Sequence, residues 1–248
     1  MSTPPLPTFL IIGAQKSGTR WLRTRLGQQP GVFTAPGEPM YFSNPARVAE
    51  EGPARYLESF EGWDGEPVVG EATPSYMVFH RRPPAVAQRI LDLLGDDVRL
   101  VAILRDPVDR AQSAVAHHLR SGALPEGTTL ESHARDVDPR KDRLGIIASG
   151  WYATCLDPYV EHFGDGLLVL LHDDLSTDPG GLYRAACTHI GADPTFVPEG
   201  LERPVHVGQP GGSEVAPDLR RELWDTQYRD EVARLEAMTG RDLSRWAP

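Results

Sequence analysis

Short continuous apolar runs alternate along this chain with segments whose apolar residues recur every three or four positions. Four runs have the character of strands buried on both faces: residues 8–12, 67–70, 98–104 and 167–171. Helical spacing, together with proline and glycine punctuation, predicts helices over 45–59, 83–94, 107–121, 146–163, 180–190 and 217–239. Because strands alternate with helices, the pattern predicts a three-layer α/β/α fold with a central parallel sheet.

Length and composition favour one folded unit. The chain has 248 residues, of which 40% are hydrophobic and 24% are charged, so a single core can bury most of its apolar surface. We therefore expect one domain over residues 1–248. Residues 203–216 contain three glycines and two prolines, which predicts a mobile loop within that domain.

Charge, hydropathy and cysteine content exclude several classes of protein. A net charge of -10 argues against a nucleic-acid-binding protein, because phosphate neutralisation needs clustered Lys and Arg. No apolar run approaches the roughly 20 residues of a membrane span, and no signal peptide is recognisable, so we expect a cytoplasmic protein. Cys155 and Cys187 lack metal-ligand spacing and are interpreted as core residues of helices, with one disulfide left open. The sequence carries no indication of oligomeric state.

The first predicted strand ends in a glycine loop with an unusual lysine. Gly13 and Gly18 have the spacing of a phosphate-binding loop, in which a lysine and a hydroxyl residue normally follow the second glycine and the hydroxyl holds magnesium. Here Thr19 and Arg20 follow Gly18, and the lysine is Lys16, inside the loop. Backbone amides at a helix start and a nearby ammonium group still form an anion site, whereas the usual metal-binding arrangement of the loop is lost.

A second segment places polar groups at the same edge of the predicted sheet. In LRDPVDRAQSAVAHHLRSG, residues 104–122, Arg105 follows a strand at its carboxyl end, where open α/β sheets bind their ligands. Pro107 suits the first turn of a helix, and Ser113 falls about two turns along it. Arg105 and Ser113 could both contact one phosphate, the first through a bidentate charged contact.

The loop and the second segment together resemble the two donor-binding motifs of the sulfotransferases that use 3′-phosphoadenosine 5′-phosphosulfate (PAPS). The resemblance implies a P-loop-like fold, a K-[ST]-G-T loop that binds the 5′-phosphosulfate, and an Arg and a Ser eight residues apart that bind the 3′-phosphate. The matching residues are Lys16, Ser17, Gly18, Thr19, Arg20, Trp21, Arg105 and Ser113. It also implies transfer of a sulfuryl group to a hydroxyl, with PAPS as donor co-substrate and no metal. A sulfuryl group carries less charge than a phosphoryl group, so Lys16 and backbone amides suffice to stabilise its transfer.

Three residues are candidates for the general base. PGEPMYF, residues 36–42, resembles the stretch of the heparan-sulfate branch in which a glutamate before an aromatic pair is the base, which implies that role for Glu38. An exposed loop glutamate is the alternative. Glu71 is a reserve candidate at the end of a predicted strand; the next residue is Ala72, where heparan-type enzymes commonly have a lysine, and this weakens the case for an anionic polysaccharide acceptor. His117, beside His118, is a second reserve candidate by analogy with aryl and steroid sulfotransferases, although helical histidines are more often packing residues.

The resemblance also extends to the C-terminal region. The family often closes over its donor with a loop of basic and glycine residues, and Arg203, His206 and Gly208 occupy the corresponding region here. For the acceptor we expect a small molecule with an alcohol or sugar hydroxyl, such as a glycosylated natural product, and next a phenol.

Two other functions compete with this interpretation. A magnesium-dependent P-loop kinase or NTPase would use Asp106 as its metal-holding acid, but the G-K-[ST] order is missing and Asp106-Pro107 has the character of a helix start. A non-catalytic nucleotide-binding module could use the same fold, because a fold does not fix a function.

Overall fold

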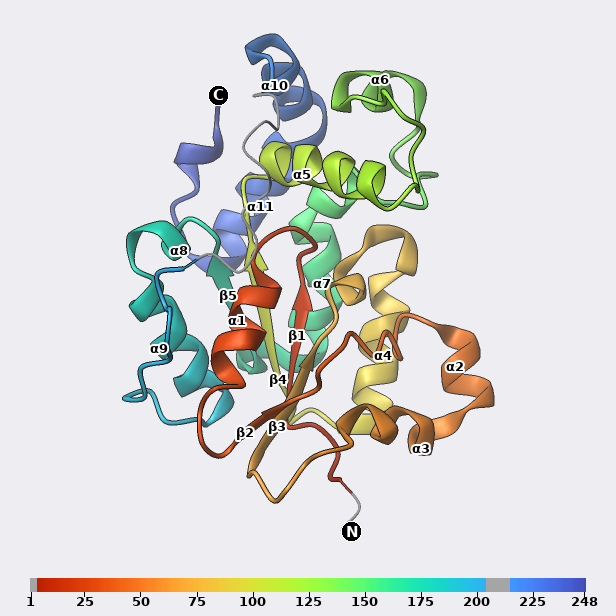
Figure 1. The fold of residues 1–248 in the computed structure, drawn as a ribbon. Coiled ribbons are helices and arrows are strands. Elements are labelled where there is room, and N and C mark those ends of the chain that lie inside the picture. The colour runs from red at the N-terminus through yellow and green to blue at the C-terminus, as the bar shows by residue number, and fades with distance from the viewer. Residues whose placement is uncertain (1–3, 204–214) are drawn as a thin grey trace.

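Five parallel strands form a sheet at the centre of the part of the chain that the structure describes. The computed structural model describes residues 4–203 and 215–248. The strands lie in the order β2-β3-β1-β4-β5, as Figure 1 shows. Their bounds are β1 Phe9–Gly13, β2 Val32–Thr34, β3 Val68–Ala72, β4 Arg99–Leu104 and β5 Leu167–Leu171. The predicted parallel sheet is confirmed, and β2 is an addition to the four predicted strands.

Helices cover both faces of the sheet. Their bounds are α1 Thr19–Leu26, α2 Pro45–Glu50, α3 Gly52–Leu57, α4 Pro83–Leu94, α5 Pro107–Arg120, α6 Leu130–Asp136, α7 Tyr152–Phe163, α8 Asp174–Thr177, α9 Pro179–Ile190, α10 Pro217–Leu223 and α11 Arg229–Thr239. None of the helices in residues 4–203 and 215–248 is long and apolar enough to cross a membrane.

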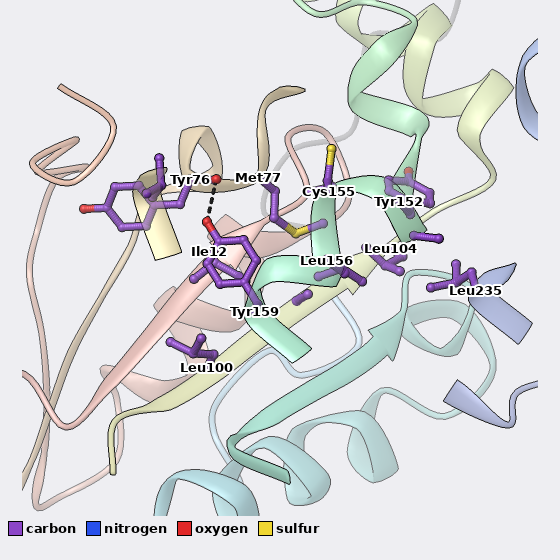
Figure 2. Packing of buried hydrophobic residues seen from close by; sticks show 14 of the residues in the cluster. Ile12, Tyr76, Met77, Leu100, Leu104, Tyr152, Cys155, Leu156, Tyr159 and Leu235 are labelled. Atoms are coloured by element: carbon purple, nitrogen blue, oxygen red, sulfur yellow. Dashed lines mark hydrogen bonds between the residues drawn. The ribbon is translucent and has the colours of Figure 1, made fainter. Parts of the chain in front are cut away.

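The core has two parts, one on each face of the sheet. Along β1, Phe9 and Ile11 pack with α1 and α9, whereas Leu10 and Ile12 pack with α4 and α7. This alternation follows from the period of two in a strand. Figure 2 shows the second part, where Tyr159 of α7 donates a hydrogen bond to the carbonyl oxygen of Tyr76 at 2.7 Å. The three-layer α/β/α fold is thereby confirmed.

The two cysteines belong to the two parts of the core. Cys155 of α7 and Cys187 of α9 are buried, and both are free thiols. Their predicted role as small core residues is confirmed, and no bridge joins them.

Three predicted helices differ from the observed ones. The helix expected over 45–59 is divided, because Gly52 has a φ of +65° and begins α3, with Pro53 in its first turn. The helix expected over 146–163 begins only at Tyr152, because the Asp142 side chain accepts the N–H of Ile146 and holds the preceding segment in a turn. The helix expected over 217–239 is interrupted by a π-helical turn, Trp224–Tyr228.

Candidate active site

The central strand β1 delivers the glycine loop to the carboxyl edge of the sheet. Gly18 caps α1 with a φ of +102°, and a side chain there would approach Leu175 to 2.7 Å. Its cap carries no side-chain hydrogen bond, so the N–H groups of the first turn remain available to an anion. Ser17 is fully buried and its hydroxyl has no hydrogen-bond partner among the described residues. It lies near the Tyr152 hydroxyl, which donates instead to the Arg105 carbonyl oxygen at 2.8 Å.

Lys16 lies where several charges converge. Burial lowers its pKa, the cations Arg120 and Arg105 lower it further, and Glu38 raises it. These groups come from the end of α5, the end of β4 and the loop after β2. The fold therefore brings Lys16, Arg105 and Glu38, which are distant in the sequence, to one edge of the sheet.

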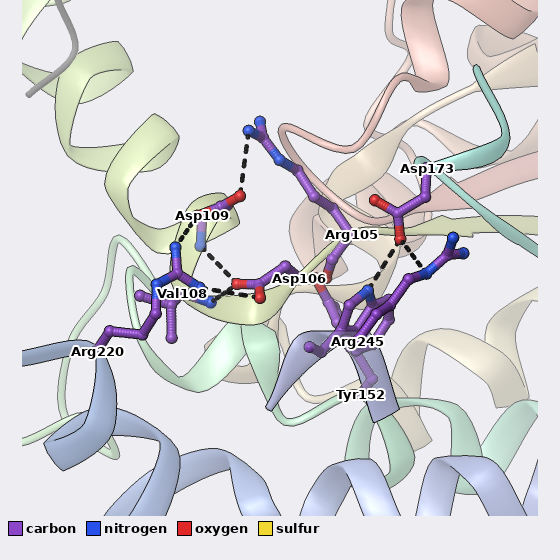
Figure 3. Close-up of polar contacts among 9 residues, drawn as sticks. Arg105, Asp106, Val108, Asp109, Tyr152, Asp173, Arg220 and Arg245 are labelled. Atoms are coloured by element: carbon purple, nitrogen blue, oxygen red, sulfur yellow. Dashed lines mark hydrogen bonds and ion pairs between the residues drawn. The ribbon is translucent and has the colours of Figure 1, made fainter. Parts of the chain in front are cut away.

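Arg105 is anchored through its backbone and only loosely held through its side chain. Its guanidinium lies 3.9 Å from the Asp109 carboxylate, at the limit of an ion pair, as Figure 3 shows. Asp109 also pairs with Arg220 of α10. Because the tighter partner of Asp109 is Arg220, the Arg105 guanidinium remains available to a phosphate.

Asp106 begins α5 as its capping residue. One carboxylate oxygen accepts the N–H groups of Val108 and Asp109, each at 2.9 Å, and the other pairs with Arg220 at 3.0 Å. Burial raises the pKa of Asp106, while the backbone N–H of Asp109 and the charge of Arg220 lower it. The carboxylate is thus occupied by the helix start and by α10.

The remaining residues of the donor motifs lie in different surroundings. Thr19 is buried, Arg20 is exposed, and Ser113 is half-buried two turns along α5. Trp21 belongs to the core that α1 shares with α9, and the Arg25 guanidinium lies 5.9 Å from the centre of its ring.

Glu38 lies on the wall of a groove of about 490 Å³. Glu38 is exposed, in agreement with the alternative of an exposed loop glutamate, yet the protein around its carboxyl group partly desolvates it and raises its pKa; Arg23, Arg20 and Lys16 act in the opposite direction. The groove is lined by Pro36, Gly37, Glu38, Pro39, Tyr41, Arg47, Glu51, Arg55, Tyr56, Glu58, Ser59 and Glu61. Glu38 therefore stands between the cations of the glycine loop and this groove.

Glu71 is a buried carboxyl group surrounded by hydroxyls. Tyr76 and Thr73 each donate to it at 2.6 Å, and Tyr56 donates at 3.3 Å. Desolvation raises the pKa of Glu71 to about 7 against these hydrogen bonds. Glu71 does not itself line the groove. It is connected to the groove through Tyr56, which lines the groove and donates a hydrogen bond to Glu71.

Comparisons with known proteins agree with this arrangement. The family model described as the sulfotransferase domain matches residues 6–206. This chain belongs to the sulfotransferase domain family. The solved structure of a sulfotransferase from Alicyclobacillus acidocaldarius has a TM-score of 0.77 and 31% identity, covering 98% of this chain and 99% of that one.

Two curated relatives are longer than this sulfotransferase-family chain. Heparan sulfate glucosamine 3-O-sulfotransferase 3B1 of Mus musculus is 28% identical over 96% of this chain and 64% of its own length. Heparan sulfate glucosamine 3-O-sulfotransferase 6 of Homo sapiens is 31% identical over 71% of this chain and 49% of its own length. The chain thus spans less than two thirds of these relatives.

Among the reserve and C-terminal candidates of this sulfotransferase-family protein, His117 and Arg203 lie within the described residues and others lie outside them. His117 is half-buried, and burial together with Lys16 and Arg120 lowers its pKa. Arg203 is exposed, and its backbone carbonyl accepts a hydrogen bond from Arg25 at 2.9 Å. His206, Gly208 and most of the expected mobile loop lie outside the described residues.

The sequence analysis missed four arginines of this site. Arg23 acts on Glu38, Arg47 lines the groove, Arg120 acts on Lys16, and Arg220 pairs with Asp109. The sequence spacing could have predicted Arg23, because it lies three residues after the motif residue Arg20 and therefore on a neighbouring helical face. No sequence feature predicted a role for Arg220, because its helix has the ordinary charged face of a surface helix.

Proposed function

We propose that this protein transfers a sulfuryl group from PAPS to a hydroxyl of a small-molecule or glycosylated acceptor and releases 3′-phosphoadenosine 5′-phosphate (PAP). The observation that carries the proposal is the convergence of Arg105 and Glu38 on Lys16, since both charges act on the Lys16 ammonium. One site then contains a 3′-phosphate contact, a cation for the transferring group and a base. We also propose that the chain is a single domain; its cytoplasmic location stays a prediction.

The residues of the glycine loop fit the anionic donor. The buried Ser17 hydroxyl has no hydrogen-bond partner in the part of the chain that the structure describes, the first turn of α1 presents N–H groups, and Lys16 adds a positive charge. When bound, PAPS supplies an activated sulfuryl group. Lys16 would neutralise the phosphate oxygen from which the sulfur departs, while Arg105 and Ser113 would hold the 3′-phosphate.

Glu38 is the best placed of the three candidate bases. Partial desolvation raises the pKa of Glu38, which makes it a stronger base, and three nearby cations act in the opposite direction. Glu71 is enclosed by Tyr56, Thr73 and Tyr76, so it meets an acceptor less directly. His117 stays in reserve because it lies close enough to Lys16 for that cation to lower its pKa.

The groove beside Glu38 is our candidate acceptor site. Glutamates outnumber arginines in its lining, four to two, and Arg55 is already paired with Glu51 and Glu58. An excess of negative charge repels a sulfated polysaccharide, attracts an amino-bearing acceptor and does not oppose a neutral one. We therefore favour a small or glycosylated acceptor of that charge over the anionic glycans in the names of the curated relatives.

The kinase alternative is disfavoured by the surroundings of Asp106. A magnesium-holding acid presents a free carboxylate oxygen to the ion, whereas Asp106 caps α5 with one oxygen and pairs with Arg220 through the other. A binding module without catalysis is the remaining alternative, and sulfuryl-transfer assays of wild type and Glu38→Gln test it.

The donor is tested by calorimetry with PAP, AMP and ATP, each with magnesium and with EDTA. We expect metal-independent preference for PAP, and a loss of about 2 kcal/mol, roughly 30-fold, in Arg105→Ala, because a charged contact to the 3′-phosphate disappears. Arg99→Ala is the matched control, since Arg99 is exposed at the opposite end of the same strand. Magnesium-dependent preference for ATP would overturn the proposal in favour of a kinase.

A further inference from the structure

The loop that carries Glu38 is held from both sides by arginines. Arg23 of α1 donates to the Gly37 carbonyl oxygen at 2.8 Å, and Arg47 of α2 donates to the Pro39 carbonyl oxygen at 2.8 Å. These two carbonyl groups belong to the residues immediately before and after Glu38. The Gly37 carbonyl is part of the peptide group that precedes Glu38, and the Pro39 carbonyl is part of the peptide group between Pro39 and Met40, so the two guanidinium groups hold the loop on either side of Glu38.

A third contact ties the same loop to the end of β3. The Met40 N–H donates to the Thr73 hydroxyl oxygen at 3.3 Å, and the Thr73 hydroxyl donates in turn to Glu71 at 2.6 Å. Met40 has a φ of +55°, an uncommon conformation that persists only when the surroundings hold it. Residues 37–40, which form no helix or strand, are therefore fixed by three separate elements.

We propose that Arg23 and Arg47 are positioning residues that hold the Glu38 carboxylate at the junction of the donor site and the groove, and that the positive charge of Arg23 in addition attracts this carboxylate. The proposal rests on the proposed function, in which Glu38 is the base. A base on an unsupported loop would sample many positions, and catalysis is sensitive to displacements of about 1 Å.

The two arginines differ in their electrostatic effect. Arg23 leads the cations that lower the pKa of Glu38, followed by Arg20 and Lys16, and Arg47 is not among them. Other charges near this loop are Glu71 beneath it and, across the groove, Arg55, Glu51, Glu58 and Glu61. Removal of Arg23 is therefore expected to raise the pKa of Glu38, whereas removal of Arg47 affects the position of the loop alone.

Nuclear magnetic resonance tests both parts of the proposal without an acceptor. The Glu38 carboxyl carbon is assigned by its disappearance in Glu38→Gln, and its titration and the backbone order parameters of residues 37–40 are measured in Arg23→Gln and Arg47→Gln. We expect order parameters to fall from about 0.85 toward 0.6 in both variants, and the titration midpoint to move to higher pH only in Arg23→Gln. Arg23→Lys should restore the midpoint, because it restores the charge.

Two results would overturn the proposal: order parameters that stay at the wild-type value in both variants, or equal titration midpoints in Arg23→Gln and wild type. Thermal unfolding checks that each variant is folded, and Arg23→Met or Arg47→Met, which likewise remove the charge and the hydrogen bond, replace any that is not. PAP affinity is measured beside them and should be unchanged. If wild type fails to bind PAP, the proposed function fails while the behaviour of the loop is still decided.

Discussion

The donor side and the groove side of this molecule are built differently. The donor side consists of the ends of β1 and β4 and the starts of α1 and α5, whose backbone is fixed by the sheet and by helix caps. The groove side consists of a loop and two short helices, and α2 has no buried residue. We propose the first as a rigid anion site of backbone groups and cations, whereas the second depends on single side chains that hold a loop.

The largest expected effect is that of Glu38→Gln, which should impair catalysis on the groove side without impairing binding on the donor side. Glu38→Gln should lower sulfuryl transfer by about 10²- to 10⁴-fold, because the general base is lost, and should leave PAP binding unchanged. Conversion of PAPS to PAP with a panel of neutral, amino-bearing and anionic hydroxyl acceptors measures the first, and calorimetry measures the second.

Lys16→Ala provides the contrast on the donor side. It should lower transfer by about 10²- to 10³-fold and weaken PAP binding as well, because the same ammonium contacts the donor in both states. Unimpaired transfer by Glu38→Gln would mean that Glu38 takes no part in the mechanism. The donor side and the groove side would then both serve binding alone.

The next effect concerns the buried carboxyl group beneath the groove side. The folded protein raises the pKa of Glu71 from 4.5 to about 7, so it binds this proton more tightly than the unfolded chain does. The associated stability is fully present below about pH 4.5 and is lost as the pH rises through 7, by about 3 kcal/mol. Urea unfolding between pH 5 and 8 should therefore show a steeper fall in wild type than in Glu71→Gln.

Glu50→Gln is the control for this measurement, because Glu50 is an exposed glutamate of α2. It should keep the steep wild-type profile. Parallel profiles for wild type and Glu71→Gln would mean that the buried carboxyl group does not titrate in this range.

The smallest effect tests how the C-terminal helices support the donor side. Arg220→Gln frees Asp109 to pair closely with Arg105, so PAP affinity should fall about tenfold, which corresponds to about 1.4 kcal/mol. Adding Asp109→Asn to Arg220→Gln should restore the affinity, because the competing carboxylate is gone. Calorimetry with PAP measures both.

Arg234→Gln is the matched control for Arg220→Gln. Arg234 joins α11 to Asp157 of α7 and has no contact with Arg105 among the described residues, so its loss should leave PAP affinity unchanged. If the second substitution does not rescue Arg220→Gln, the effect of Arg220 is general to the packing of α10 and not specific to Arg105.

The prediction of regular elements from the sequence succeeded where the apolar run was continuous and failed where elements were short. The four predicted strands exist because each has a continuous apolar run, whereas Val32–Thr34 has three residues and a single buried one. Leu130–Asp136 was also missed, although Thr129 and Ser132 form a capping box at its start. A short element carries too few apolar positions for a period to be recognised.

The sequence by itself determined the fold class and the residues of the two family motifs. Both depend on local spacing, from Gly13 to Gly18 and from Arg105 to Ser113, and on the strands that precede them. Residues at such spacing keep their relation wherever the strand and helix form.

Only the tertiary structure decided what surrounds the candidate base. Arg23, Arg47 and Thr73 reach the loop of Glu38 from three elements, and two of them bind backbone carbonyl groups. A backbone carbonyl is the same at every residue, so no side-chain pattern in the sequence marks it as a partner. The position of Glu38 is therefore a property of the folded chain.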